Sequence, residues 1–384
     1  MTSANKKFFY EAETSTGQKL FIKKQSLITV GEDGGVYINQ DTFCEAAAFQ
    51  RLRDCNSPNI VHLYRTVVDP ENLTVEFQMR LMDRFPDHLP NYADKVRYIR
   101  DIFEGLWGMH KAGVLHRDVK LDNIMLDPIT GQACFIDFGL SVLDEERYAS
   151  LPGTYYTLQF RPPEILMSCK NYENQKCEVW AAGVCAAIIL LDDQSIFYGV
   201  DSVDVLSRIL GCTRVPNALV NAPFWQSFYD KWDGPKYEEQ SLWDRITDPL
   251  ARDFVMKCLD FNSVTRPTIW QMLNHDFIKG MDLGRRPLQT PIPPNLSFDN
   301  ISRCLSHCPP ATRPMLYKMH CILENDPAKS YPKLYVVSLL VYVFAGHIFR
   351  LDTVHDPKAI MMKPILASVF SDVNTIRVLS RIYV

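Results

Sequence analysis

Two carboxylates, a lysine and an amide are grouped near the middle of the chain. Asp118, Lys120 and Asn123 lie on one predicted loop, and Asp137 follows a short hydrophobic strand behind it. A carboxylate can accept a proton from a hydroxyl group, and a lysine can neutralise negative charge. Amide and carboxylate oxygens suit a hard cation such as magnesium. Phosphoryl transfer requires this combination, because its transition state depends on positioning and charge neutralisation more than on covalent chemistry.

The two segments that carry these residues read H-R-D-V-K-L-D-N and D-F-G, in that order. This order resembles the eukaryotic protein kinases, and the lysine of the first segment resembles their serine/threonine branch. The resemblance implies ATP and Mg2+ as cofactors. It also implies that Asp118 orients and deprotonates the attacking hydroxyl and that Lys120 neutralises charge on the γ-phosphoryl group. Asn123 and Asp137 would hold the magnesium ion.

A third segment, T-L-Q-F-R-P-P-E, begins at Thr157 and ends at Glu164. It is similar to the T-x-x-Y-R-A-P-E segment of the cyclin-dependent and mitogen-activated kinases. The similarity implies that Thr157 bridges Asp118 and Lys120 and shapes the floor under the substrate residue. It also implies an ion pair between Glu164 and Arg266. If buried, such a bidentate pair would cost about 3–5 kcal/mol to break from one side.

Other residues resemble structural and regulatory positions of this kinase group. Glu178 begins E-V-W-A-A-G, which is similar to D-x-W-S-x-G with glutamate in place of aspartate. Its extra methylene is expected to weaken the hydrogen bonds that hold the catalytic loop. Thr154, Tyr155 and Tyr156 lie where these kinases take activating phosphates, and Arg117 is the usual cation for such a phosphate. The alternative is that they are three ordinary loop hydroxyls.

The N-terminal region carries the expected nucleotide-binding lysine. The residues from Tyr10 to Lys23 resemble the second and third strands of a kinase, where V-A-I-K supplies a lysine for the α- and β-phosphates. Lys23 would be this lysine, and Glu45 on the following helix would be its partner. Lys24 is the alternative, although strand alternation would direct its side chain to the opposite face.

The stretch from Val75 to Asp83 resembles the kinase strand that ends in the hinge between the lobes. Met79 would guard the back of the adenine pocket, and the backbone of Arg80 and Met82 would hydrogen-bond the purine. The alternative is a plain core strand that carries no ligand.

The glycine-rich loop of the family, G-x-G-x-x-G-x-V, has no counterpart before Tyr10. The stretch Thr2–Phe9 contains no glycine, and too little chain precedes Tyr10 for the usual first strand. Without glycine the backbone cannot approach the phosphates closely, so either the phosphate cover is improvised or nucleotide affinity is reduced. The segment Gly31–Val36 is not a displaced copy, because no lysine lies between Val36 and Glu45. It is expected to be a solvent loop.

Apolar periodicity predicts the elements that must position these residues. Strands are expected at 8–12, 20–23, 60–68 and 73–82, and helices at 41–53 and from 93 towards the loop that carries Asp118. A strand-rich small lobe followed by a helix-rich large lobe is also what the kinase resemblance implies.

Composition limits the classes of partner. The chain of 384 residues is 47% hydrophobic, and its 41 basic and 45 acidic residues are well mixed, giving a net charge of -4. No basic tract indicates nucleic acid. Met1–Lys7 lacks the apolar stretch of a secretory signal, so an intracellular protein of the cytoplasm or nucleus is expected. The apolar run Leu334–Phe349 is shorter than a bilayer needs, so a buried helix is favoured over a membrane span.

The 11 cysteines include no C-x-x-C pair, which is typical of core residues in a reducing compartment. Ligand-type side chains are nevertheless clustered at Cys304, His307, Cys308, His320 and Cys321. Structural zinc sites usually show tighter paired spacing, so two helical faces with buried thiols are the favoured interpretation.

The predicted architecture is an α+β bilobal kinase fold with an all-α C-terminal extension. The expected domains are an N-lobe at 1–82, a C-lobe at 83–281, and a linker with a helical extension at 282–384. The extension is either a cyclin-like module acting in cis or a packing or partner-binding element. The predicted function is transfer of the ATP γ-phosphoryl group to a serine or threonine of a protein substrate, with a cyclin-like or other regulatory partner. The rival function is a pseudokinase scaffold that holds partners without turnover.

Overall fold

The computed structural model describes residues 7–15, 17–30, 36–53, 55, 57–69, 72, 74–143, 156–167, 173–212 and 242–280. These residues divide into two compact units. The first unit contains 7–47 and 62–81, and the second contains 48–61 and 82–280. The predicted linker and extension at 282–384, the cluster around Cys304, and both Thr154 and Tyr155 lie outside the described residues.

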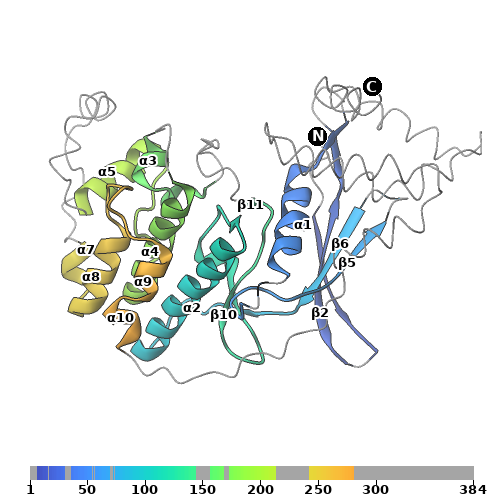
Figure 1. Cartoon of the computed structure of the whole chain (residues 1–384), viewed down its shortest axis with the longest axis horizontal. Helices are drawn as coiled ribbons and strands as arrows, with labels where there is room; N and C mark the ends of the chain where they lie inside the picture. The colour runs from blue at the N-terminus through green and yellow to red at the C-terminus, as the bar shows by residue number, and fades with distance from the viewer. Residues whose placement is uncertain are drawn as a thin grey trace, which may run out of the picture. The chain divides into compact units, whose positions relative to one another are not determined.

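A four-stranded antiparallel sheet forms the first unit, in the order β1-β2-β6-β5 (Figure 1). Its strands are β1 (Phe8–Glu13), β2 (Lys19–Ser26), β5 (Leu63–Asp69) and β6 (Thr74–Arg80). The turn after β1 contains Gly17 with φ of 80°, a left-handed conformation that suits glycine. The four predicted strands are therefore present at nearly the predicted places.

Register in this sheet decides which side chains share a face. Lys23 lies opposite Phe77, and Gln25 lies opposite Val75. Cross-strand partners point to the same side of a sheet, so these four residues share one face. That face is buried, since Gln25 and Phe77 are 0% exposed and Lys23 is 3% exposed.

The helix α1 (Gln40–Leu52) follows a short antiparallel hairpin of β3 (Ile28–Val30) and β4 (Val36–Ile38). The helix was predicted and the hairpin was not, because strands this short show too little alternation to be distinguished from a loop. The hairpin ends at Asn39, whose backbone N–H donates to the carbonyl of Leu27 at 3.0 Å. The start of α1 is thereby attached to the chain that leaves β2.

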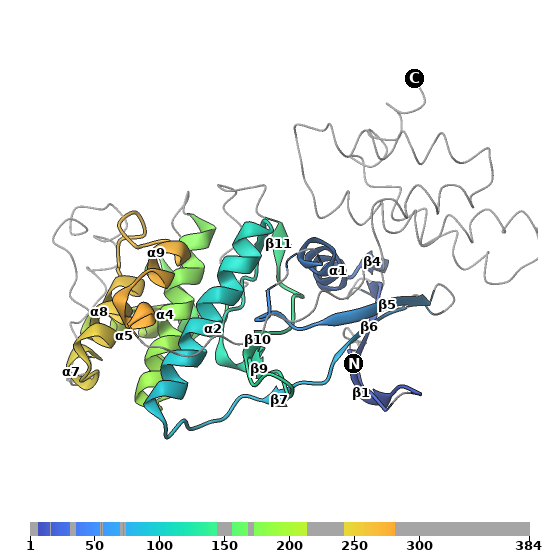
Figure 2. The ribbon, with the colours of Figure 1, turned by 60° about the horizontal axis from the view of Figure 1, so that its bottom comes forward.

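Short antiparallel pairs organise the beginning of the second unit. β10 (Ala133–Phe135), β9 (Ile124–Leu126) and β7 (Asp83–Arg84) form one sheet in that order (Figure 2). β8 (Val114–Leu115) pairs with β11 (Val142–Leu143). The pairing of β8 with β11 closes a loop of chain, and that loop contains Asp118, Lys120, Asn123 and Asp137.

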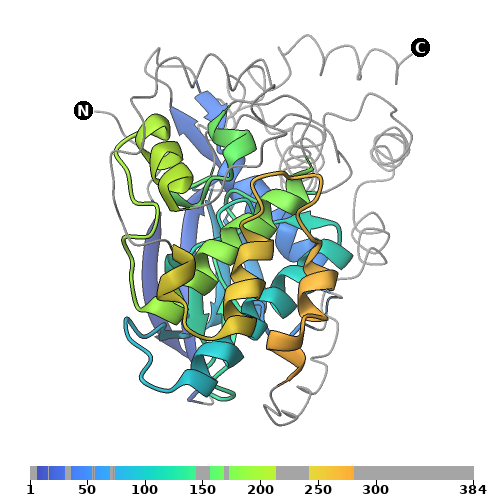
Figure 3. The same ribbon diagram turned by 90° about the vertical axis from the view of Figure 1, so that its left-hand side faces the viewer.

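Helices supply most of the second unit. The long helix α2 (Tyr92–Lys111) is capped at its N-terminus by Asn91, whose side chain accepts the N–H of Ala93. It packs against α4 (Asn174–Leu191) and β10. Figure 3 shows these helices from the side, with α2 in teal and α4 in green. The other helices of the described residues are η1 (Leu121–Asn123), η3 (Leu158–Phe160), α3 (Pro163–Leu166), α5 (Ser202–Cys212), α7 (Leu242–Arg245), α8 (Pro249–Cys258), α9 (Ile269–Leu273) and α10 (Asp276–Lys279).

Close approach of α4 to α8 depends on Gly183. A Cβ atom at this position would lie 2.5 Å from the Cβ atom of Cys258, which is too short for a contact between non-bonded carbons. The rings of Phe103 and Phe254, 5.0 Å apart, extend the same core towards α2. Among the helices of the described residues, none has the length and apolar character to cross a membrane.

Candidate active site

The loop between β8 and η1 is anchored on both sides by buried groups. Val119 is 1% exposed, and the His116 side chain is 0% exposed with Nε2 3.1 Å from the carbonyl oxygen of Ile136. Arg117 has φ of 65°, a left-handed conformation that is unfavourable for a residue with a long side chain. The surrounding structure must therefore hold this loop in place.

Four predicted residues form one hydrogen-bonded group in the second unit. The hydroxyl of Thr157 donates to Asp118 Oδ1 at 2.6 Å and accepts from Lys120 Nζ at 3.0 Å. Lys120 Nζ also lies 2.9 Å from Asp118 Oδ2. Asn123 Nδ2 donates to Asp118 Oδ2 at 2.9 Å and to the backbone oxygen of Asp118 at 2.8 Å. Thr157 thus bridges Asp118 and Lys120, as the sequence predicted.

Asp137 lies at the end of the β9–β10 hairpin that also carries Asn123. Ile136 donates its backbone N–H to the carbonyl of Asn123 at 3.0 Å, so the ladder continues to the residue before Asp137. Asp137 has φ of 56°, and its Oδ1 accepts the N–H of Gly139 at 3.2 Å. The buried ring of Phe138 packs 5.1 Å from the ring of Phe49 and fixes the turn.

The side chains of Asn123 and Asp137 suit a magnesium ion. Asn123 uses its Nδ2 atom as the donor to Asp118, which leaves its amide oxygen as the atom suited to a cation. Asp137 adds a carboxylate on the same hairpin. Magnesium is usually held by one or two carboxylates together with phosphate oxygens. An amide oxygen and a carboxylate are therefore a fitting protein share of such a site.

Glu178 holds the strained part of the catalytic loop. Its Oε1 accepts the backbone N–H of Arg117 at 2.7 Å, and its Oε2 lies 2.6 Å from Nε2 of His110. The side chains of Glu178 and His110 are 0% and 4% exposed. The expected weakening by the extra methylene is not seen in this geometry, because each oxygen has a close partner. His110, a basic residue in the last turn of α2, was not identified from the sequence.

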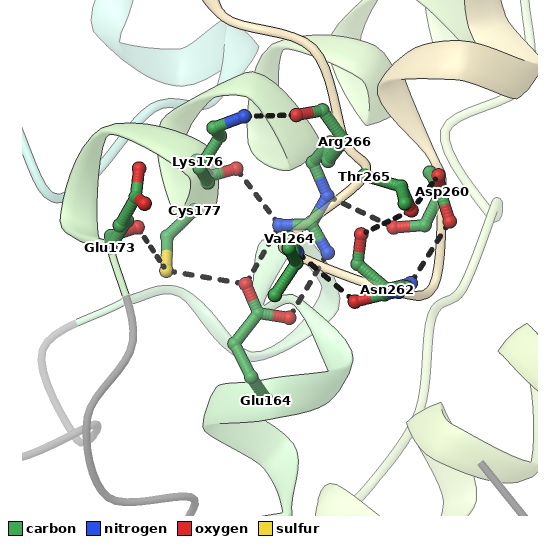
Figure 4. Close-up of polar contacts among 9 residues, drawn as sticks. All are labelled: Glu164, Glu173, Lys176, Cys177, Asp260, Asn262, Val264, Thr265 and Arg266. Carbon is green, nitrogen blue, oxygen red and sulfur yellow. Dashed lines mark hydrogen bonds and ion pairs between the residues drawn. The ribbon is translucent and has the colours of Figure 1, made fainter. Parts of the chain in front are cut away.

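Glu164 and Arg266 form the predicted bidentate ion pair (Figure 4). Arg266 NH1 lies 2.7 Å from Glu164 Oε1, and NH2 lies 3.0 Å from Oε2. Burial opposes the charge of Arg266, but the Glu164 carboxylate raises the pKa of the guanidinium above its usual value. Cys177 donates its thiol to Glu164 Oε1 at 3.5 Å, and burial raises the pKa of this thiol well above the ordinary value. Lys176 and Arg266 also exchange contacts with each other's backbone oxygens.

In the first unit, Lys23 pairs with Glu45. Lys23 Nζ lies 2.8 Å from both carboxylate oxygens, and the two side chains are 4% and 0% exposed. Lys24, the alternative lysine, instead pairs with Glu76 at 3.1 Å on the other face of β2. A hydrogen bond from Lys24 to Glu76 raises the pKa of Lys24. Strand alternation therefore separated the two lysines as expected.

Two polar residues beside this pair were not identified from the sequence. Gln25 Nε2 donates to Glu45 Oε2 at 2.5 Å, and Thr42 Oγ1 donates towards Gln25 Oε1 at 3.2 Å. The signal was present, because Gln25 lies two positions after Lys23 and must share its face of the strand. The same strand carries Phe21, which stacks on the half-exposed ring of Phe9 with centroids 5.8 Å apart.

The predicted hinge residues are found on both sides of the division between the units. Met79 of β6 is 4% exposed in the first unit. Arg80 donates its backbone N–H to the carbonyl of His62 at 3.0 Å and its Nε to the hydroxyl of Tyr64 at 3.2 Å. Its N–H is therefore already used. Met82 is buried in the second unit, at 8% exposure.

Tyr156 is the one residue of the predicted phosphorylation segment that the structure describes. Its side chain is 3% exposed and packs with Ile165 and Cys177. The carbonyl of Tyr156 accepts a hydrogen bond from Nε of Arg161 at 2.7 Å. Another kinase could therefore reach this hydroxyl only after local opening of the core.

A sheet unit with a buried Lys–Glu pair and a helical unit with H-R-D and D-F-G loops define the protein kinase class. In agreement, the sequence model of the protein kinase domain matches residues 10–278. The chain therefore belongs to the protein kinase domain family.

Curated relatives support this group. The chain is 28% identical to CTD kinase subunit alpha of Schizosaccharomyces pombe, over 71% of this chain and 46% of that protein. It is also 28% identical to cyclin-dependent kinase D-1 of Arabidopsis thaliana, over 74% of this chain and 71% of that protein. The chain thus spans less than half the length of the first relative, at 46%, and 71% of the length of the second.

Solved structures share the fold. The CAK complex from Chaetomium thermophilum bound to ATP-gamma-S contains a chain with a TM-score of 0.59 at 20% identity, covering 71% of this chain and 87% of that chain. The crystal structure of the yeast RNA Pol II CTD kinase CTDK-1 complex contains a chain with a TM-score of 0.59 at 19% sequence identity, covering 76% of this chain and 96% of that chain. The predicted kinase fold, with a β-sheet N-lobe and a helical C-lobe, is confirmed.

Proposed function

We propose that this chain is an active serine/threonine protein kinase that transfers the γ-phosphoryl group of ATP to a protein hydroxyl. The observation that carries the proposal is the hydrogen-bonded group of Thr157, Asp118, Lys120 and Asn123. A kinase needs a carboxylate held at a fixed angle to the incoming hydroxyl and a cation close to the transferring phosphate. This group supplies both from one loop, and the Thr157 hydroxyl holds them together, at 2.6 Å from Asp118 Oδ1 and 3.0 Å from Lys120 Nζ.

Each residue then has a chemical role. Asp118 accepts the proton of the substrate hydroxyl, a step that typically contributes ~10²–10⁴-fold to the rate. Lys120 neutralises negative charge on the γ-phosphoryl group. Asn123 and Asp137 hold magnesium, which neutralises the phosphate oxygens when bound. Glu178, Glu164 and Arg266 act indirectly, by holding the loop and the segment that follows it.

The nucleotide contacts of the first unit belong to the same proposal. Lys23 binds the α- and β-phosphates, and Glu45 orients Lys23. Met79 lines the back of the adenine site. Arg80 offers its carbonyl to the purine rather than its N–H, which His62 already binds, and the Met82 backbone supplies a further contact. We also propose the domain limits 1–82, 83–281 and 282–384.

A regulatory protein partner is part of the proposal. The two solved structures described above are complexes, and the two relatives described above are a CTD kinase subunit and a cyclin-dependent kinase. We therefore expect a cyclin-like partner and a protein substrate, with the RNA polymerase II CTD as one substrate to test. A phosphate on Thr154 or Tyr155 would be a second means of activation, with Arg117 as its cation.

One observation favours a second function, a scaffold without turnover. Strand β1 contains no glycine, and its Phe9 stacks on Phe21, which lies two residues before Lys23 on β2. An aromatic pair at this place reduces the room for a nucleotide. A protein that kept the kinase fold but bound no ATP would then serve only to hold partners.

Two measurements on the full chain separate these functions. The first is a thermal shift with ATP and magnesium, and the second is transfer of radiolabel from ATP to a generic basic protein and to the CTD. We expect the wild type to show both a shift and transfer. Asp118→Asn should keep the shift and lose at least ~10²-fold of the transfer rate. No shift and no transfer in the wild type would support the scaffold, and full transfer by Asp118→Asn would refute the assignment of Asp118.

A further inference from the structure

Gln25 is a polar residue in an apolar setting. Its cross-strand partner is Val75, and Phe77, the partner of Lys23, lies next on the same face. Val75 and Phe77 are 2% and 0% exposed, and Gln25 itself is 0% exposed. Burial of an amide without hydrogen bonds costs free energy that a Met or Leu at this position would not. The presence of an amide here is therefore explained only by what it binds.

Both ends of the Gln25 amide contact α1. Nε2 donates to Glu45 Oε2 at 2.5 Å, and Oε1 lies 3.2 Å from the hydroxyl of Thr42. Thr42 and Glu45 are three residues apart in the helix, so they lie on the same face. Because a carboxylate only accepts hydrogen bonds, Nε2 and not Oε1 must face Glu45. The amide therefore has one orientation that satisfies both neighbours.

Additional contacts attach the start of α1 to β2. Thr42 Oγ1 lies 3.0 Å from the carbonyl of Ser26, and Asn39 Nδ2 donates to the same carbonyl at 3.0 Å. Ser26 follows Gln25 at the end of β2. These contacts fix the start of α1, and with it Glu45, against the strand that carries Lys23. All of these residues belong to the first unit.

We propose that Gln25 is a positioning residue that holds the Glu45 carboxylate against Lys23. A buried carboxylate paired with a flexible ammonium can turn about its side-chain torsions, and the ammonium moves with it. An amide donor to a charged acceptor forms a strong and directional hydrogen bond, which restricts that motion. The inference rests on the proposed function for its effect on ATP, but the positioning of Lys23 can be measured without catalysis.

Gln25→Met tests the inference, because methionine has a similar length and no amide. The matched control is Gln78→Met, which makes the same change on β6 opposite Ile22, on the other face of the sheet. The first readout is the rate at which a lysine-acylating reagent labels Lys23, followed by mass spectrometry of the folded full chain. We expect ~10-fold faster labelling of Lys23 in Gln25→Met and no change in Gln78→Met. Lys24 is the internal standard, and equal acceleration at Lys24 would mean general loosening and would overturn the proposal.

The second readout is ATP affinity with magnesium, measured by calorimetry. Gln25→Met should weaken ATP binding ~10-fold when Glu45 is present. In the Glu45→Gln variant the same change should have little effect, because a residue that acts through Glu45 has no further effect once the Glu45 carboxylate is gone. An equal effect in both backgrounds would overturn the proposal. If Gln25→Met does not fold, Thr42→Val removes the neighbouring contact and should shift both readouts in the same direction by less. A wild type that binds no ATP but protects Lys23 would contradict the proposed function and leave the positioning role intact.

Discussion

The carboxylate of Glu178 lies 2.7 Å from the backbone nitrogen of Arg117, the residue before Asp118. Arg117 has a positive φ of 65°, which costs free energy for a residue with a side chain. A fully buried acceptor thus stabilises the one strained peptide on which the direction of Asp118 depends. The second oxygen of Glu178 is occupied by His110, so the acid joins α2, α4 and the loop.

Glu178→Asp shortens this connection by one methylene. We expect the aspartate to keep only one of the two contacts, because it cannot reach both Arg117 and His110. Loss of one buried hydrogen bond to a charged group should lower the free energy of unfolding by about 1–3 kcal/mol, measured by urea denaturation. An unchanged midpoint would show that the backbone adjusts to the shorter side chain.

Thr157→Val removes the hydroxyl that bridges Asp118 and Lys120 and keeps the branched shape. We expect kcat to fall by ~10-fold or more, because a hydrogen bond to a charged group is worth about 1.5–3 kcal/mol. Binding of ATP should be unchanged, since the hydroxyl of Thr157 bonds Asp118 and Lys120, which act on the reacting groups. Thr157→Ser retains the hydroxyl and is the control, so a similar loss in both variants would contradict the bridging role.

Glu164→Gln leaves the guanidinium of Arg266 buried without its opposite charge. The expected loss is about 3–5 kcal/mol in the free energy of unfolding, seen as a lower melting temperature. The comparison is Lys257→Gln, which breaks an ion pair with Asp253 whose side chains are 48% and 50% exposed and should cost less than about 1 kcal/mol. Equal destabilisation by the two changes would mean that burial of the Arg266 pair contributes nothing.

Asp192 gives a pH-dependent prediction. Burial opposes its charge, but Lys95 at 2.6 Å and the N–H of Leu89 together lower its pKa below the ordinary carboxyl value. A carboxyl whose pKa is lower when folded stabilises the protein above its unfolded pKa, and this stabilisation is lost as the pH falls through the folded value. Asp192→Asn should therefore melt lower than wild type at about pH 7, and the difference should shrink towards about pH 3.

Asparagine suits this test because residue 192 has φ of 51°, a conformation that asparagine tolerates. The groups that face Asp192 are Lys95, His88 and the backbone of Leu89. A difference in melting temperature that stays constant over the whole range would show that the charge of Asp192 does not stabilise the fold.

The contacts among residues that belong to the kinase-like motifs could be predicted from the sequence alone. Asp118, Lys120 and Thr157 were expected from their motifs to meet, and they do. Asp118 and Lys120 lie in the loop closed by β8 and β11, and Thr157 comes from the chain after β11. Glu164 and Arg266 were also matched correctly across a long separation. The motif, not the composition, carried this information.

Residues that depend on packing between elements were harder to find. Gln25 resembles any polar residue of a strand until α1 is placed over it, and His110 resembles a helix-end cation until Glu178 is seen beside it. The β3–β4 hairpin was not predicted, because a strand of three residues is too short for its apolar alternation to be recognised. For Gln25 and His110, the missing information was which helix or strand packs against which other element.

The pairing of Glu164 with Arg266 also sets an order of events during protein synthesis. The two residues are 102 positions apart, and α4 and α8 both lie in the intervening chain. While the ribosome is still adding that stretch, the carboxylate has no guanidinium to meet and must remain in water. The contact between Glu164 and Arg266 can therefore form only after residue 266 has been synthesised.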